Sequence, residues 1–137
     1  MRPHMEVLKE ARVIAIVGLS DRPDRDSHEV GKYLQSVGYK IIPVNPALTD
    51  QLVLGEKCHA SLLSIPEQID IVDIFRRPNA IIPIAKDAIK VKAGMIWMQE
   101  GIINEEAAVI ARKAGLNVVM DMCTMVEHKK MPFNQLS

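Results

Sequence analysis

The sequence predicts an α/β fold with a five-stranded parallel sheet, strand order 3-2-1-4-5, covered by helices on both faces in three layers. Two observations carry this prediction. Short β-branched apolar runs, typical of strands buried on both faces, alternate along the chain with longer segments of helical period. A length of 137 residues and an apolar fraction of 48% suit one core, so residues 1–137 are expected to form a single domain.

The apolar runs set the predicted strands. In chain order they cover residues 13–17, 39–44, 69–75, 95–98 and 117–120. Gly18 ends the first run at once. Residues 48–68 form a long connection without a clear helical pattern, and we expect a short strand and a single turn there.

Helical patterns lie between the strands. From His28 the apolar period becomes helical, with one stripe made of Val30, Tyr33, Leu34 and Val37. Pro83 suits the first turn of a second helix that runs to Val91. Asn104 is expected to cap a third helix, because acidic residues fill its first turn and Gly115 follows its end.

The charge balance narrows the possible partners. Seventeen basic and seventeen acidic residues give no net charge, so no general attraction to nucleic acid or to an anionic membrane is expected. No apolar run approaches the ~20 residues of a membrane span. Cys58 and Cys123 lack the paired spacings of zinc sites or disulfide scaffolds, so we expect no metal and a cytoplasmic location.

The loop after the first strand is the strongest candidate for binding. Ligands of open parallel sheets bind beyond the carboxyl ends of the strands, and this loop also leads into a helix N-terminus that attracts anions. It offers two hydroxyls and two guanidinium groups, from Ser20, Ser27, Arg22 and Arg25. A second interpretation stays open, in which Ser27, or Asp26 with Glu29, caps the helix.

Familiar nucleotide fingerprints are absent. The dinucleotide pattern G-x-G-x-x-G requires three glycines, and only Gly18 is present in this loop. The second strand ends in Asn45-Pro46 instead of the acidic residue that holds a ribose in nicotinamide enzymes. A P-loop is also missing, so an ordinary dehydrogenase or P-loop enzyme is not expected.

Other candidates follow later strands. Arg76-Arg77 fits either a solvated turn or an anion contact at the binding edge. Trp97 is expected in the core. Cys123, Glu127 and His128 resemble a nucleophile or metal set, but no third acid, second histidine or water-activating pair stands near them in sequence. We therefore expect no catalytic residue and favour a buried structural thiol for Cys123 over a reactive one.

These residues together resemble the single-domain CoA-binding protein family, a Rossmann-like group related to the N-terminal domain of the succinyl-CoA synthetase alpha subunit. The similarity runs from about Ala11 to His128. It rests on an ordered set of fragments: Val17-Gly18-Leu19-Ser20, Ser27, Gly38-Tyr39, Pro43-Val44-Asn45-Pro46, Ser61-Leu62, Ile65-Pro66, residues 69–76, Trp97-Met98-Gln99, residues 115–121 and Cys123.

The resemblance implies a coenzyme A or acyl-CoA ligand. It places the diphosphate on the first loop, from Gly18 and Leu19 to Ser27, and the adenosine near Asn45-Pro46. It also implies that Phe75 and Arg76 flank the ligand and that Gln99 to Gly101 line the pantetheine side. The active-site histidine and second domain of the larger synthetases have no counterpart in this sequence.

Three functions follow as hypotheses. The first is a non-catalytic, cytoplasmic CoA-binding carrier, sensor or partner subunit, whose protein partner the sequence does not name. The second is a CoA-dependent or thiol-redox enzyme component completed by a partner, with Cys123 open to thiol exchange with CoA. The third is a regulator that binds a nicotinamide nucleotide, which the missing glycines and ribose carboxylate disfavour.

Overall fold

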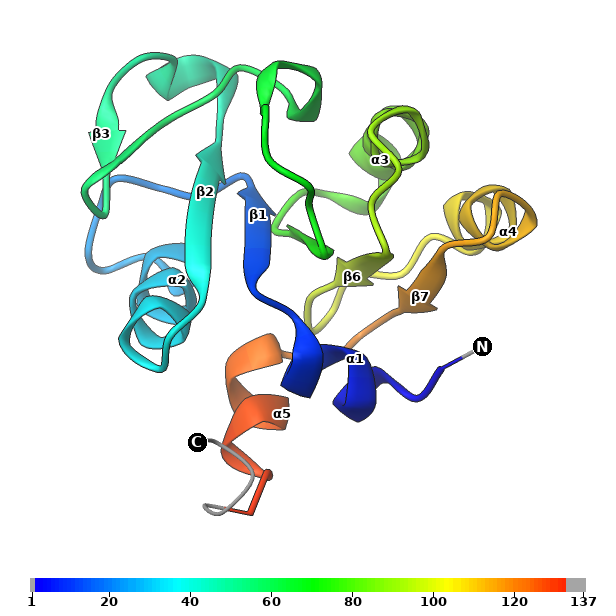
Figure 1. The fold of residues 1–137 in the computed structure, drawn as a ribbon. Helices are drawn as coiled ribbons and strands as arrows, with labels where there is room; N and C mark the ends of the chain where they lie inside the picture. The colour runs from blue at the N-terminus through cyan, green and yellow to red at the C-terminus, as the bar shows by residue number, and fades with distance from the viewer. Residues whose placement is uncertain (1, 133–137) are drawn as a thin grey trace.

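The computed structural model describes residues 2–132 and has the predicted Rossmann-like architecture (Figure 1). One parallel sheet holds five strands in the spatial order β2-β1-β5-β6-β7. Their bounds are β1 Val13–Val17, β2 Lys40–Val44, β5 Ile71–Ile74, β6 Met95–Met98 and β7 Asn117–Val119. The predicted α/β class with five parallel strands is confirmed.

The predicted strand order needs one correction. The third predicted strand, β5, pairs with β1 and lies between β1 and β6, so the order of these five strands is 2-1-3-4-5 and not 3-2-1-4-5. The outer side of β2 is already occupied, since the amide of His59 donates to Pro43 and the carbonyl of His59 accepts from Asn45. The chain after β2 therefore returns past β1 to add its next strand on the other side.

The connection between β2 and β5 carries no α-helix. It contains two 3₁₀ turns, η1 Pro46–Leu48 and η2 Leu62–Ser64, and a small antiparallel hairpin of β3 Leu52–Val53 and β4 Glu56–Lys57. The short strand and the turn expected within residues 48–68 are thus present.

Helices cover both faces of the sheet. α1 (His4–Glu10), α2 (Asp26–Ser36) and α5 (Thr124–Lys129) lie on one face, and α3 (Ile81–Lys90) and α4 (Glu105–Lys113) on the other (Figure 1). Side chains of a strand alternate between the faces, so Ile14 and Ile16 pack toward α1 and α2 while Ala15 packs toward α3 and α4. The apolar runs reflect this double burial.

The helix signals are largely confirmed. Asn104 caps α4, accepting a 2.9 Å hydrogen bond from the amide of Ala107. Pro83 lies in the first turn of α3, and α2 begins two residues before the predicted His28. The sequence patterns did not predict α1. Among residues 2–132, no helix has the length and apolar character that crossing a membrane requires.

Candidate functional site

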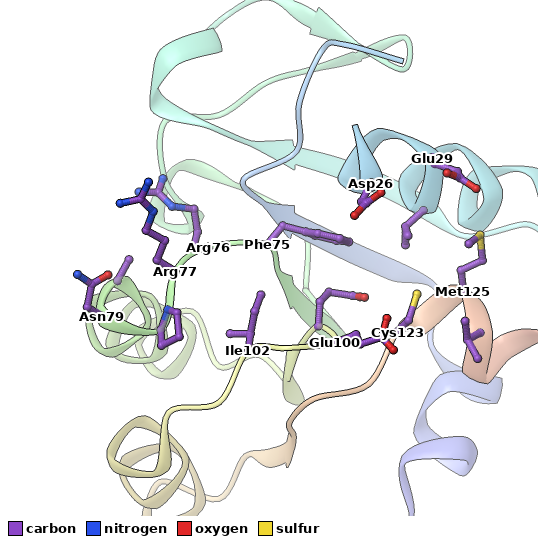
Figure 2. A pocket seen from close by; sticks show the side chains of 15 residues that line it. Asp26, Glu29, Phe75, Arg76, Arg77, Asn79, Glu100, Ile102, Cys123 and Met125 are labelled. Carbon is purple, nitrogen blue, oxygen red and sulfur yellow. The ribbon is translucent and has the colours of Figure 1, made fainter. Parts of the chain in front are cut away.

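A cavity of about 1070 Å³ lies beyond the carboxyl ends of the strands, which we call the edge cavity. The chain leaves β1 toward one face of the sheet and β5 toward the other, so this is where connections diverge and ligands bind in such folds. Its walls are Asp26, Glu29, Val30, Phe75, Arg76, Arg77, Pro78, Asn79, Ala80, Gln99, Glu100, Ile102, Cys123, Met125 and Val126. Arg76 and Arg77 stand at one end and Cys123 and Met125 at the other, with Phe75 between them (Figure 2).

Gly18 brings the loops after β1 and β5 into contact. Its φ of +88° is a conformation that side chains disfavour. A Cβ at this position would also lie 2.4 Å from the carbonyl oxygen of Phe75 and 3.1 Å from Cδ of Arg76. Glycine is therefore required for the two loops to form one continuous surface.

The first loop is ordered by its own serines. Oγ of Ser27 accepts a 3.0 Å hydrogen bond from the amide of Ser20, and Oγ of Ser20 accepts one from the amide of Arg22. No side chain caps α2, so the alternative in which Ser27 or Asp26 caps it is wrong. A hollow of about 510 Å³ above this loop shares Asp26 and Phe75 with the edge cavity.

The sequence-predicted site residues fall into four groups. Phe75, Arg76, Arg77, Gln99 and Cys123 line the edge cavity itself. Gly18, Ser20, Arg22, Arg25 and Ser27 line the adjoining hollow. Pro46 lines a third hollow, of about 160 Å³, which reaches Arg76. The residues that line none of these three spaces are Leu19, Asn45 and Gly101.

The last group has structural roles. The side chain of Leu19 is buried in the core, while its carbonyl accepts a 3.1 Å hydrogen bond from Nδ2 of Asn45. Asn45 thereby joins the loops that follow β1 and β2. The amide of Gly101 donates to Oδ1 of Asp121 at 2.6 Å, which ties the loop after β6 to the end of β7. These positions shape the site through the backbone.

Several cations at the site have no carboxylate partner. None of the ion pairs among residues 2–132 involves Arg25, Arg76 or Arg77, and all three side chains are exposed. Arg22 lies 3.6 Å from Asp24 in a solvent-exposed pair. Carboxylates of Asp26, Glu29 and Glu100 line the same cavity, so the guanidinium groups supply local cation sites in a chain without net charge.

A buried polar network lies behind the cavity. Asp73 of β5 is fully buried, and its carboxylate accepts hydrogen bonds from Nε2 of Gln99 and, at 2.9 Å, from Oγ1 of Thr124. Nε2 of Gln99 also donates to Oγ1 of Thr124 at 2.8 Å. Burial raises the pKa of Asp73 to about 7, although the hydrogen bonds from Gln99 and Thr124 oppose that rise.

Comparison with known proteins decides the family. The family model for the CoA binding domain matches residues 12–129. The chain belongs to the CoA-binding domain family. The predicted resemblance is thereby confirmed.

This CoA-binding domain resembles proteins of two sizes. It is 45% identical to uncharacterized protein YneT of Bacillus subtilis over 90% of both chains. The solved structure of cell-free ID.343 from Thermus thermophilus superposes with a TM-score of 0.88 at 38% identity, covering 91% of this chain and 93% of the other. The ADP-forming acetate–CoA ligase I of Archaeoglobus fulgidus is 27% identical over 95% of this chain, which spans only 20% of the ligase.

The two cysteines of the CoA-binding domain differ in their surroundings. Cys123 is half-buried on the cavity wall and also packs against the core, so the predicted full burial of this thiol is wrong. The buried thiol is Cys58, which donates to the carbonyl of Asn45 at 3.5 Å and whose pKa burial raises. Trp97 is fully buried, as predicted, and donates to the carbonyl of Met122.

Glu127 and His128 do not form a metal or catalytic set with Cys123. Glu127 pairs with His4 at 2.9 Å and Lys130 at 2.7 Å, and His128 hydrogen-bonds the hydroxyl of Tyr33 at 2.7 Å. These contacts fasten α5 to α1 and α2. Within the described part of the chain, no cluster of three His, Cys, Asp or Glu side chains is arranged to hold a metal ion.

Sequence reasoning missed the partners of Gln99. Asp73 is the one charged residue inside the buried strand β5, and an acidic residue in a strand buried on both faces is a signal that we left unused. Thr124 carried no comparable signal. It lies 51 residues from Asp73 in sequence, and only the tertiary fold brings the two together.

Proposed function

We propose that this domain binds coenzyme A or an acyl-CoA in the edge cavity and the two adjoining hollows, as a non-catalytic carrier, sensor or partner subunit. The observation that carries the proposal is the set of three unpaired arginines in a neutral CoA-binding domain, Arg76 and Arg77 on the edge cavity and Arg25 on the hollow beside it. CoA bears a diphosphate and a 3′-phosphate, and charge-assisted hydrogen bonds from guanidinium groups are strong ligands for both.

The three spaces suggest how the ligand lies. The hollow over the first loop has uncapped amides of α2 and the guanidinium of Arg25, which suit the diphosphate. The small hollow beside Pro46 is lined largely by apolar side chains and reaches Arg76, which suits the adenosine with its 3′-phosphate. The edge cavity then receives the pantetheine arm, which runs past Gln99 with its thiol toward Cys123.

A binding role is favoured over catalysis by the residues on the cavity walls. Among the described residues that line the edge cavity, Cys123 has no histidine beside it to act as a base. The similarity to part of a ligase favours a second candidate, an enzyme component completed by a partner. Free thiols at Cys58 and Cys123 suit a reducing cytoplasm.

Calorimetric titration with CoA, NAD and NADP in one buffer tests the proposal. We expect CoA to bind at least tenfold more tightly than either nicotinamide nucleotide, because the chain lacks the glycines and the ribose carboxylate that those ligands require. Equal affinities, or binding of NAD alone, would reject CoA as the ligand and favour the nicotinamide regulator.

A further inference from the structure

The side-chain amide of Gln99 is held in one orientation. Gln99 is almost fully buried where the chain leaves β6, and its Nε2 donates to both Asp73 and Thr124. A carboxylate only accepts hydrogen bonds, so ionised Asp73 requires the NH₂ group of Gln99, and not its oxygen, to point inward. Oγ1 of Thr124 closes the network by donating to the second oxygen of Asp73.

The carbonyl oxygen of Gln99 consequently faces the edge cavity. No donor among residues 2–132 hydrogen-bonds Oε1 of Gln99. That part of the chain also has no side-chain nitrogen or oxygen that is both sealed from solvent and unpaired. Since Gln99 lines the cavity, its Oε1 is an acceptor that opens into it.

The chemistry of this oxygen restricts what it contacts. Phosphate oxygens are acceptors and would be repelled by it, whereas an N–H group would be satisfied. Several neighbours on the cavity wall are apolar, among them Phe75, Ile102 and Val126. An amide N–H buried against such walls costs free energy unless it finds an acceptor. The pantetheine arm of CoA carries two amide N–H groups.

We propose that Asp73 and Thr124 are positioning residues that hold the Gln99 amide with its oxygen toward the cavity, where it accepts a hydrogen bond from a pantetheine amide N–H. This inference rests on the proposed CoA-binding function and deepens it. It gives the ligand a direction, with the phosphates at the arginines and the arm at Gln99. Asp73 acts through Gln99 and touches no ligand atom.

The neighbours of Asp73 support a role beyond packing. In the sheet it lies between Ile16 of β1 and Trp97 of β6, both apolar and buried. An apolar residue there would keep the core packed without the cost of burying a carboxyl group. The network that retains this carboxyl ends on Gln99, a side chain that lines the cavity.

The test compares CoA with 3′-phosphoadenosine 5′-diphosphate, which has the phosphates and the base of CoA but lacks the pantetheine arm. Calorimetry gives the ratio of the two affinities for each protein. We expect a wild-type ratio of about 10 or more, the effect of one satisfied hydrogen bond together with arm packing. Asp73→Asn lets Gln99 turn its NH₂ group to the cavity and should lower the ratio to about 3 or less.

Three further variants separate positioning from folding. Gln99→Leu removes the acceptor and should lower the ratio as far as Asp73→Asn does. Thr124→Val should lower it partly, and Thr124→Ser, which keeps the hydroxyl, should leave it unchanged. All four should keep the wild-type affinity for 3′-phosphoadenosine 5′-diphosphate, because the arginines are untouched.

The outcomes distinguish the two proposals. If neither compound binds the wild type, the proposed function itself is wrong. If both bind it equally, or if Gln99→Leu and Thr124→Val leave the ratio unchanged, CoA binding stands and the positioning role of Asp73 is rejected. Should Asp73→Asn fail to fold, the Gln99 and Thr124 variants still decide.

Discussion

Two carboxyl groups at α5, one beside the helix and one on it, have pKa values that are shifted in opposite directions. Asp73 meets Thr124 at the start of the helix, where its side-chain donors are neutral and burial raises its pKa to about 7. Glu127, one turn later, pairs with Lys130 and His4, and these hydrogen bonds lower its pKa despite partial burial. Complete burial without a neighbouring cation among residues 2–132 raises the pKa of Asp73, whereas the neighbouring cation lowers the pKa of the less deeply buried Glu127.

The difference separates two uses of a buried acid. Glu127 joins α1 to α5, so its charge stabilises the fold. Asp73 has no cation partner among the described residues when it is ionised, and it contacts a side chain of the proposed ligand site. A carboxyl group that costs stability next to a binding cavity is the pattern expected of a functional residue.

Replacement of Asp73 by Asn should give the largest effect on stability. The pKa of Asp73 is raised in the folded state, so wild-type stability falls as pH rises from about 4 to about 7 and the cost is complete above it. Asp73→Asn should therefore raise the free energy of unfolding by about 2–4 kcal/mol at pH 8.5, with little change at pH 4. Urea unfolding at both pH values measures this. A variant less stable than wild type at pH 8.5 would show that Asp73 serves the fold.

Arg25 and Arg76 are the cationic counterpart of Asp73, because neither forms an ion pair with a carboxylate in the described part of the fold. If Arg25 and Arg76 contact phosphates, changing either to Ala should weaken CoA binding by about 1.5–3 kcal/mol, and by less where the contact stays exposed to solvent. The salt dependence of binding should also flatten. Arg22→Ala is a matched control with a smaller expected effect, because Arg22 already lies near Asp24. Wild-type affinity in the Arg25 and Arg76 variants at low salt would mean that the phosphate site is misplaced.

Glu127 should show the opposite pH dependence with a smaller amplitude. Its pKa is lowered in the folded state, so its contribution is present above the unfolded value of about 4.3 and is lost as pH falls through the folded value. Glu127→Gln should lower the free energy of unfolding by about 1 kcal/mol at pH 7, and the difference should shrink toward pH 3. A difference that grows in acid would contradict the assignment.

The two cysteines differ in burial, and the smallest effect we expect is a difference in their reaction with oxidised CoA. If Cys123 lies on the path of the pantetheine arm, its thiolate should attack the disulfide of oxidised CoA, forming a mixed disulfide and releasing one CoA thiolate. We expect intact-protein mass spectrometry to show one CoA-sized adduct that reductant removes and Cys123→Ser lacks. Cys58, which is fully buried, is the internal control. An adduct on Cys58, or none, would leave Cys123 outside the path of the arm.

The sequence predicted most of the fold because the burial of a strand is visible in the apolar character of its own residues. Val13 to Val17 is apolar throughout since both faces of β1 are covered, and Asn104 caps α4 through a contact three residues away. The order of the strands in the sheet could not be predicted in this way, because it depends on contacts between residues distant in sequence. It depends on His59 occupying the outer side of β2, which no pattern around His59 indicates.

The site was predictable to the extent that it is made of loops. Gly18, Phe75 and Gln99 each follow a strand directly, and parallel strands bring such positions to one edge. The exposure of Cys123 and the contact between Asp73 and Thr124 depend on how α5 folds back over the sheet. Neither follows from the spacing of the residues.

The central claim, that CoA lies at the carboxyl edge of the sheet, is tested most directly by an NMR titration of ¹⁵N-labelled protein with CoA. We predict saturable shifts in the amides of Gly18, Ser20, Arg76 and Gln99, around the three hollows. The amides of Lys9 and Gly38, beside α1 and the end of α2, should stay unchanged. Shifts confined to the amides around Lys9 and Gly38, or no saturable shift at millimolar CoA, would contradict the assignment of the CoA site.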